Sequence, residues 1–409
     1  MTQSSSRRLR HLCLSTAFVF IASTLCSFAL AQTTSEADRE QALNLLWRES
    51  KPAAALPLLE KLAKDRPEDG LVAFSYGFAL LAKVKVIKDP AARKQTRVDA
   101  RGWLLKAQKL GVDEPLLKSV LEGLPPDGGI DETYSPVKEA DDAMRDGESF
   151  FVNGQFLEAA DAYQRALKAD PKLYEAALFT GDMYFKVGQN EKAAEWYTKA
   201  QQINPDRETA YRYSATPFLR SGKLDEAKAR YIDAVIVEPY NRMTWSGLNQ
   251  WAQAAGVQLG HPNIDVPKTL KSTVDNKVYI TVDPSDVDLK SDRNGTSAWS
   301  VYGRHRTNWL TTEFAKAYPN ETAYRHSLRE EAAALQAVVD AVKQGQKDKK
   351  IVQLDESLAN LVKLSDAGLL EPFILYALVD EGIAKDYYEY KKINREKLKR
   401  YLVEYVTAK

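Results

Sequence analysis

The chain has 409 residues, 44% of them hydrophobic and 28% charged, so it is long enough for two or three domains with buried cores. Its 57 Lys and Arg residues nearly balance its 56 Asp and Glu residues. This balance argues against a nucleic-acid-binding protein, whose contact surface is strongly basic.

Residues 1–31 have the features of a cleavable export signal. Three arginines, the last of them Arg10, form a basic start, residues 12–28 are largely apolar, and an Ala-Leu-Ala sequence ends at Ala31. The residues after the arginine pair do not fit a twin-arginine signal, so ordinary secretion is favoured. We therefore expect cleavage after Ala31 and a periplasmic or secreted protein.

Cleavage would remove Cys13 and Cys26, the only cysteines of the chain. The exported protein would then contain no disulfide, no catalytic thiolate and no zinc site built on cysteine. It would also lose three arginines and no acidic residue, which changes the formal net charge from +1 to −2.

Residues 32–125 contain apolar residues at helical spacing, which predicts two pairs of amphipathic helices. The basic stretch from Lys83 to Arg97 is expected to enlarge the turn within the second pair. Residues 126–139 contain Pro, Asp and Gly and are expected to form a linker. The residues that form this pattern are Leu43, Leu46, Ala55, Leu59 and Leu62 in the first pair, and Ala73, Tyr76, Gly77, Leu80, Ala100, Leu104 and Ala107 in the second.

Between residues 140 and 256, three prolines are spaced 34 residues apart, and the residues between them repeat in register. When each proline is counted as position 32, position 8 is Gly or Ala, position 11 is aromatic, positions 20 and 27 are Ala, and position 24 is Tyr. Small residues let two antiparallel helices approach closely, and aromatic residues fill the space between helices. The prolines are Pro171, Pro205 and Pro239, and the repeated positions are Gly147, Gly181 and Ala215; Phe150, Tyr184 and Phe218; Ala159, Ala193 and Ala227; Tyr163, Tyr197 and Tyr231; and Ala166, Ala200 and Ala234.

This pattern resembles the tetratricopeptide repeat, a helix–turn–helix unit that stacks into an α-solenoid. The resemblance implies an all-α fold in which residues 140–256 form three repeats and a capping helix. Gly154, Gly188 and Gly222 fit the turns within the repeats, because glycine tolerates positive φ. The helices of residues 32–125 are then expected to be degenerate versions of the same repeat.

Residues 257–409 are predicted to form a mainly helical C-terminal domain. The alternation of apolar residues over 278–282 indicates a short strand or an extended arm. Asn320 is a candidate N-cap after Pro319. The expected helices cover residues 296–318, 320–344, 355–364, 369–379 and 386–406.

In the tetratricopeptide family, positions 2, 5, 9 and 12 of the first helix of each repeat face a concave groove. Family members that bind peptide C-termini place Lys, Arg and Asn at several of these positions to hold a carboxylate. In this chain the first two repeats have acidic residues instead. The groove residues that the resemblance implies are Asp141, Met144, Glu148 and Phe151, then Glu175, Leu178, Asp182 and Phe185, and then Arg212 and Leu219.

The resemblance therefore implies a groove for a protein or peptide segment that carries apolar anchors and basic residues. The acidic residues would orient the segment. Phe151, Leu178, Phe185 and Leu219 would contact its anchors, or would instead pack against neighbouring repeats.

Two weaker signals lie in the C-terminal region. Trp299, Tyr302 and Arg306 fall on one helical face, which fits a binding patch or, as we favour, an aromatic face buried against another element. His326 and Glu330 are four residues apart, a spacing that suits metal ligands. We favour pairing of His326 with a carboxylate, or its solvation, because the chain has few histidines.

Two further signals are also better explained without a ligand. Four aspartates between Asp283 and Asp292 superficially resemble a calcium-binding loop, but Lys290 and Arg293 break its order. The basic helix from Tyr387 to Arg400 fits a solvated face, and contact with anionic lipid or an acidic partner is the alternative.

We therefore interpret the protein as an exported, non-catalytic adaptor or scaffold that binds protein or peptide segments, with envelope assembly as one setting. We expect no catalytic residue, cofactor, metal, nucleic-acid partner or membrane span after signal cleavage. Two alternatives stay open. One is an enzyme with a catalytic C-terminal domain, which a buried titratable cluster around Arg306, His326 and Glu330 would favour. The other is a structural protein whose groove is filled by its own residues 257–282.

Overall fold

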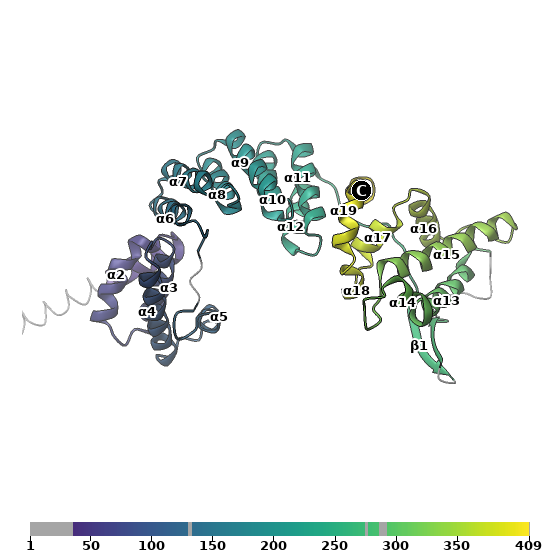
Figure 1. The fold of residues 1–409 in the computed structure, drawn as a ribbon, viewed down its shortest axis with the longest axis horizontal. Helices are drawn as coiled ribbons and strands as arrows, with labels where there is room; N and C mark the ends of the chain where they lie inside the picture. Colours follow the sequence, from purple (N-terminus) through teal and green to yellow (C-terminus); the bar gives the residue numbers. More distant parts are fainter. Residues whose placement is uncertain (1–35, 130–132, 275–276, 286–292, 409) are drawn as a thin grey trace, which may run out of the picture. The chain divides into compact units, whose positions relative to one another are not determined.

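The computed structural model of the protein describes residues 36–129, 133–274, 277–285 and 293–408. Within them the chain is mainly helical and contains one two-stranded sheet, which confirms the predicted all-α class. It divides into two compact units, Met1–Ile203 and Asn204–Lys409, which we call unit 1 and unit 2 (Figure 1). The boundary falls between the second and third predicted repeats. The predicted export signal lies outside the described residues.

The first helices of unit 1 place the predicted apolar positions in two adjoining cores. Ala55, Leu59 and Leu62 are buried in one core, and Leu104 and Ala107 are buried in the other. Gly77 lies against Leu104, where an added Cβ would come within 2.9 Å of Leu104 Cγ. The chain is helical from residue 36 into η1 (Asn44–Arg48), and the helices that follow are α2 (Pro52–Asp65), α3 (Gly70–Val84), α4 (Pro90–Lys109) and α5 (Pro115–Gly123).

The prediction of an enlarged turn between Lys83 and Arg97 is wrong. Helix α4 already begins at Pro90, and the Asp89 side chain caps it by accepting a hydrogen bond from the backbone N–H of Ala92 at 2.7 Å. Proline at the first helical position and aspartate before it are both helix-start signals. The basic residues of this stretch therefore lie mostly on a helix.

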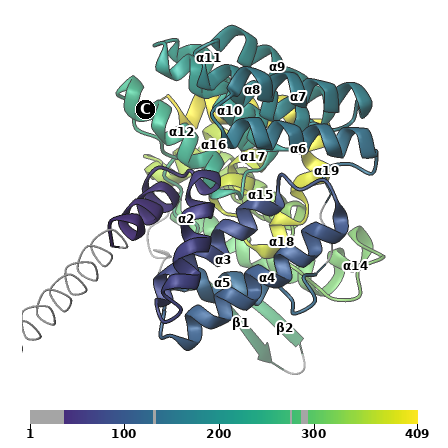
Figure 2. The same ribbon diagram turned by 90° about the vertical axis from the view of Figure 1, so that its left-hand side faces the viewer.

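The first two predicted repeats form four consecutive helices of unit 1, α6 (Lys138–Val152), α7 (Phe156–Ala169), α8 (Tyr174–Lys186) and α9 (Asn190–Ile203). Each helix packs beside the next, as both views show (Figure 2). The turns within the two repeats contain Gly154 at φ 75° and Gly188 at φ 77°, as the sequence predicts. Pro171 and Pro205 follow the ends of α7 and α9.

In each of the first two repeats, a tyrosine ring packed on a glycine joins the two helices. The rings of Tyr163 and Tyr197, at position 24, lie against Gly147 and Gly181, at position 8. A Cβ at Gly181 would come within 2.7 Å of the Tyr197 ring, closer than real Cβ contacts. Both tyrosines are almost completely buried. The glycine at position 8 therefore leaves the space that the tyrosine at position 24 fills.

Unit 2 begins with the third repeat, α10 (Glu208–Arg220) and α11 (Leu224–Val237), followed by the predicted capping helix α12 (Arg242–Ala255). Here the ring of Tyr231 lies against Gly247 of α12. Asn241 caps the start of α12, and Gly256 ends it in the left-handed conformation at φ 68°. Position 8 of the third repeat is Ala215, so here the tyrosine packs on a glycine of the following helix and not on one of its own repeat.

The C-terminal helices share one apolar core with the third repeat. The N-cap prediction at Asn320 is wrong, because α15 begins at Leu328 and is capped by Ser327, whose Oγ accepts from the N–H of Glu330. The other elements lie close to the predicted helices. They are η2 (Thr296–Trp299), α13 (Ser300–Asn308), η3 (Trp309–Glu313), α14 (Phe314–Ala317), α15 (Leu328–Lys347), α16 (Glu356–Asp366), α17 (Leu370–Ala377), α18 (Glu381–Ala384), α19 (Tyr387–Tyr401) and η4 (Leu402–Val406).

Helix α19 attaches the C-terminal helices to α11. Tyr387 donates its hydroxyl to the carbonyl of Ile236 at 2.8 Å, and the buried Lys391 bonds Asp206 at 2.8 Å. This basic helix is therefore solvated on one face only, because its other face is part of the core of unit 2.

The predicted strand over 278–282 is confirmed as β2 (Lys277–Val282), and it pairs antiparallel with β1 (Thr269–Val274), which the sequence analysis missed. Ile280 is buried, and its backbone N–H donates to Thr307 Oγ1 on α13 at 2.7 Å. Every residue of β1 is exposed. The hairpin extends from the helices of its unit (Figure 1).

Candidate functional site

The carboxylates at position 9 of the first two repeats each accept a hydrogen bond from the tyrosine at position 24 of the same repeat. Tyr163 donates to Glu148 at 3.0 Å, and Tyr197 donates to Asp182 at 2.8 Å. Burial raises the pKa of Asp182 to about 6, although the hydrogen bond from Tyr197 and the charge of Lys186 oppose this rise. Tyrosine and carboxylate are 15 residues apart in both repeats, so the 34-residue period sets this pair as well.

Asp141, the first predicted groove residue, is buried in an ion network inside unit 1. It bonds Arg145 at 2.9 Å and lies 3.7 Å from Arg93 on α4. It also accepts from the backbone N–H of Tyr134 at 2.8 Å. These contacts attach the first repeat to the preceding helices. Sequence reasoning missed the network because Arg93 is far away along the chain.

The apolar groove positions of unit 1 differ in exposure. Met144 and Leu178 are buried, whereas Phe151 and Phe185 are partly exposed. Phe151 lies 6.2 Å from the Phe156 ring, and the ammonium of Lys186 lies 5.4 Å from its centroid. Glu175 is partly exposed on the same helix as Leu178. Phe151 and Phe185 are thus the apolar positions with surface left for a ligand.

The groove positions of unit 2 are also engaged within their own unit. Arg212 bonds Glu208 through Nε at 2.8 Å and through Nη2 at 3.1 Å. Leu219 is partly buried and packs against the unit 2 core. The single basic residue among the predicted groove positions therefore already has a carboxylate partner.

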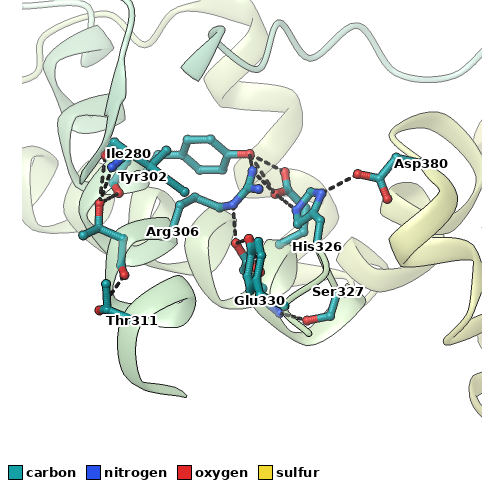
Figure 3. Close-up of polar contacts among 12 residues, drawn as sticks. Ile280, Tyr302, Arg306, Thr311, His326, Ser327, Glu330 and Asp380 are labelled. Atoms are coloured by element: carbon teal, nitrogen blue, oxygen red, sulfur yellow. Dashed lines mark hydrogen bonds and ion pairs between the residues drawn. The ribbon is translucent and has the colours of Figure 1, made fainter. Parts of the chain in front are cut away.

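A second group of functional candidates lies between α13, α15 and α18, and Figure 3 shows most of its members. Arg306 bonds Glu330 at 2.5 Å and Glu331 at 3.4 Å, and Tyr302 donates to Glu331 at 2.7 Å. Glu330 is completely buried and Glu331 nearly so. We call the following residues the ion cluster: Tyr302, Arg306, Tyr324, His326, Glu330, Glu331 and Asp380.

Charge and burial together determine the protonation of the ion cluster. Burial raises the pKa of Tyr302, and the charge of Glu331 raises it further, so the phenol stays protonated and donates. Burial and the charge of Arg306 lower the pKa of His326. Its hydrogen bonds to the carboxylates of Glu331 and Asp380 and the negative charge of Glu331 outweigh these effects, so the pKa is raised. His326 therefore pairs with carboxylates, as the sequence analysis favoured.

A comparison with known families decides the assignment of the repeats. Residues 145–208 match the family model described as tetratricopeptide repeat. The chain contains tetratricopeptide repeats.

Similar solved structures are also tetratricopeptide domains. The first such domain of Spaghetti (RPAP3), bound to an HSP90 peptide, is 24% identical and covers 30% of this chain and 98% of its own, with a TM-score of 0.28. The second domain of human RPAP3, in complex with an HSP70 peptide, is 25% identical and covers 29% of this chain and 98% of its own, with a TM-score of 0.27. YrrB, titled a protein with an unusual peptide-binding site, is 15% identical and covers 55% of this chain and 97% of its own, with a TM-score of 0.25. A search of curated proteins found no match to the chain.

The ion cluster meets the condition that the sequence analysis set for the enzyme alternative, since Tyr302, Glu330 and Glu331 are buried and the pKa values of several of its groups are shifted. However, its buried carboxylates already accept hydrogen bonds from Arg306, Tyr302, Tyr324 and His326. Two cavities of unit 2, of 400 and 590 Å³, are lined by other residues. The arrangement stabilises the packing of α13 on α15 without requiring a substrate.

The residues of the other candidate signals have structural roles or lie outside the described residues. Trp299 and Tyr302 are buried in the core of unit 2, where their rings meet edge to face at 6.0 Å. His326 precedes α15, so it does not share a helix face with Glu330. Asp283 accepts from the backbone N–H of Ser285 in a turn at 2.9 Å, and the other aspartates of the calcium-like sequence lie outside the described residues.

Two negative findings apply to the described part of the chain. No helix there is both long and apolar enough to cross a membrane. The same residues contain no group of three or more His, Cys, Asp and Glu side chains that is placed to hold a metal ion.

Unit 1 also contains a cavity that the sequence analysis did not anticipate. It has a volume of 560 Å³ and lies where α3, α4 and α6 meet the loop after α5. Lys85, Arg97, Tyr134 and Arg145 contribute to its lining. Arg97 donates to the carbonyl of Gly128 at 2.7 Å and so helps to hold the loop in place.

Proposed function

We propose that the protein is an exported, non-catalytic adaptor whose tetratricopeptide repeats bind protein or peptide segments, with a role in envelope assembly. The observation that carries the proposal is the pair of oriented carboxylates, Glu148 and Asp182, at equivalent positions of two consecutive repeats. Export is supported by the composition of residues 1–31.

The preferred ligand is a segment with basic side chains and apolar anchors. Asp182 stays partly exposed and Glu148 is 8% exposed. Phe151 on α6 and Phe185 on α8 offer apolar surface at the same position of the two repeats. A carboxylate fixed in advance by a tyrosine loses little freedom when it meets a cation, which favours binding. Basic residues of the segment would pair with Glu148 and Asp182, while an apolar side chain would contact the phenylalanines.

The experiment is affinity capture from the native envelope fraction with a variant that changes charge alone. Glu148→Gln and Asp182→Asn keep an oxygen that accepts from Tyr163 and Tyr197, so the repeats should fold as before. The matched control is Glu158→Gln with Asp161→Asn, which removes the same charge from exposed positions of α7. A partner retained by the wild type and the control but lost by the groove variant supports the proposal. Equal retention by all three proteins would place binding elsewhere.

Export is tested separately by expressing the full chain and fractionating the cells. The expected product is found outside the cytoplasm, and N-terminal sequencing starts at Gln32. A cytoplasmic product that retains residues 1–31 would contradict export without affecting the binding proposal.

The enzyme alternative has the ion cluster in its favour. Its test is a panel of small molecules screened by thermal shift against the wild type and Glu331→Gln. A ligand that stabilises only the wild type, and that the protein converts to a product, would establish catalysis.

The self-filled groove has less support. Within unit 2, the backbone of the segment after Val257 bonds the C-terminal helices, from the Gly260 N–H to the Val406 carbonyl at 3.2 Å and from the Asp265 N–H to Ser357 Oγ at 2.8 Å. The segment also contacts α12, where the ring centroids of His261 and Trp245 are 6.1 Å apart.

A further inference from the structure

His326 lies directly before the N-cap of α15, and both of its ring nitrogens face carboxylates (Figure 3). Nδ1 is 2.7 Å from Oδ2 of Asp380, and Nε2 is 3.0 Å from Oε2 of Glu331. An ionised carboxylate only accepts hydrogen bonds, and a neutral imidazole has one donor and one acceptor nitrogen. Both contacts can therefore be satisfied together only by the doubly protonated ring.

The two carboxylates differ in how easily they can be released. The Glu331 side chain is 3% exposed and also accepts from Tyr302, whereas the Asp380 side chain is 48% exposed. Leaving a buried carboxylate without a donor costs more than returning an exposed one to water. When His326 loses one proton, the remaining proton therefore stays on the nitrogen that faces Glu331. The contact with Asp380 is the one that is lost.

Asp380 also determines the start of α18. Its Oδ1 accepts from the backbone N–H of Ile383 at 2.8 Å and caps this short helix. The backbone of Gly382 lies so close to the His326 carbonyl that no side chain fits between them. The contact between His326 and Asp380 thus joins the start of α18 to the segment that leads into α15.

The charges around His326 come from three elements. Arg306 on α13 opposes its protonation, while Glu331 on α15 and Asp380 before α18 favour it. The neighbouring Arg325 bonds Asp386 at 2.7 Å and Glu321 at 2.9 Å, and an arginine keeps its charge over the whole useful pH range. Tyr302 and Glu330 both bond Arg306, so they act on His326 only through that arginine and Glu331. His326 is accordingly the group among these contacts that changes charge near neutral pH.

We propose that the contact between His326 and Asp380 depends on pH. When His326 is protonated, the contact holds the start of α18 against the start of α15, and when His326 is neutral, Asp380 is released. The pairs of Arg325 with Asp386 and of Asp386 with the N–H of Leu328 keep α19 in place, so the change is confined to residues 380–384. The inference is independent of the proposed adaptor function, because it concerns a contact inside unit 2.

The test is hydrogen exchange of the full chain, followed by mass spectrometry between pH 5.5 and 8.5 after correction for the intrinsic exchange rate. In the wild type, exchange of residues 380–384 should rise roughly tenfold as pH increases through the raised pKa of His326, as loss of one charged hydrogen bond implies. His326→Gln should exchange fast at every pH. His305→Gln, which alters an exposed histidine on α13, should behave as the wild type does.

A second variant separates the contact from general destabilisation. Asp380→Asn keeps an oxygen that can cap α18, and its NH2 group then faces Nδ1 and can pair only with a neutral ring. It should fold normally, and the rise in exchange of residues 380–384 with pH should be lost or reversed. A rise that persists in Asp380→Asn or in His326→Gln would overturn the proposal, as would constant protection in the wild type.

Discussion

The tetratricopeptide repeats and the C-terminal helices are both all-helical, but they are held together in different ways. In the first two repeats the same contact occurs 34 residues apart, with a tyrosine on a glycine and a carboxylate that accepts from the tyrosine, as in Tyr197, Gly181 and Asp182. In the C-terminal helices each polar contact occurs once and joins residues far apart, as Arg306 does with Glu330. Contacts that repeat along the sequence can be predicted from it, whereas the ion cluster occurs once and can be identified only from the structure.

The largest effect should come from the unique contacts. Arg306→Met leaves the buried Glu330 without its cation and leaves Glu331 with the cation of His326 alone, and breaking a buried ion pair in this way typically costs about 3–5 kcal/mol. We expect a loss of this size in the free energy of unfolding of unit 2, measured by urea denaturation. Arg304→Met, an exposed change on the same helix, should shift it by about 0.5 kcal/mol or less. Similar losses for both variants would mean that the ion cluster does not stabilise the unit.

The repeated contact should respond to a single methyl group. Gly181→Ala places a Cβ within 2.7 Å of the Tyr197 ring, and overpacking of this kind costs about 1–3 kcal/mol. Gly102→Ala is the control, since Gly102 lies within α4 and a Cβ there meets nothing within 4 Å. This control should stabilise unit 1 by about 0.5–1 kcal/mol, because alanine is the better helix former. Opposite signs in thermal denaturation would confirm that glycine is required at Gly181 for packing against Tyr197.

The smallest effect concerns Asp182 and depends on pH. Its pKa of about 6 in the folded protein lies above the ordinary value of 3.8, so folding binds a proton between these values. The carboxylate therefore lowers stability as pH rises from about 4 through 6, and the protonated form carries no such cost at lower pH. A shift of about two pKa units corresponds to about 3 kcal/mol, and the exposed part of the carboxylate reduces this cost. Asp182→Asn should therefore be more stable than the wild type by about 1–3 kcal/mol at pH 7.5, and the difference should disappear near pH 4.

The measurement is the difference in melting temperature between the two proteins across this pH range, and Asp161→Asn on the exposed face of α7 is the control. A difference that stays constant with pH would show that the charge of Asp182 is not the cause. If the variant is more stable and also binds less partner, the carboxylate of Asp182 lowers the stability of the protein but contributes to binding.

The sequence predicted the repeats in detail because their spacing alone places the tyrosines, glycines and prolines. Gly154 and Gly188 have the positive φ expected of turn residues, and Pro171 follows the helix that it was predicted to end. The buried Met144 and Leu178 show the limit of this reasoning, since a family groove position does not reveal how much of it neighbouring helices cover.

The C-terminal contacts were less predictable for physical reasons. The cap at Ser327 has the serine and glutamate spacing of a capping box, but the Pro-Asn sequence before it gave a competing helix-start signal. Partners such as Asp380 for His326 are 54 residues away, and no local pattern identifies them. Strand β1 was missed because all its side chains are exposed and no clear alternation marks it.

The attachment of α19 to α11 has a practical consequence for dissecting the chain. Tyr387 and Lys391 cover carbonyls of Ile236 and Val237, and Ile236 itself is completely buried. A protein shortened after Gly256 would keep all three repeats by sequence, yet it would expose the apolar side of the last one to water. Such a fragment should aggregate or require detergent, and a limited-proteolysis fragment ending there should be short-lived. The natural point of division is therefore between Ile203 and Asn204, within the array of repeats rather than after it.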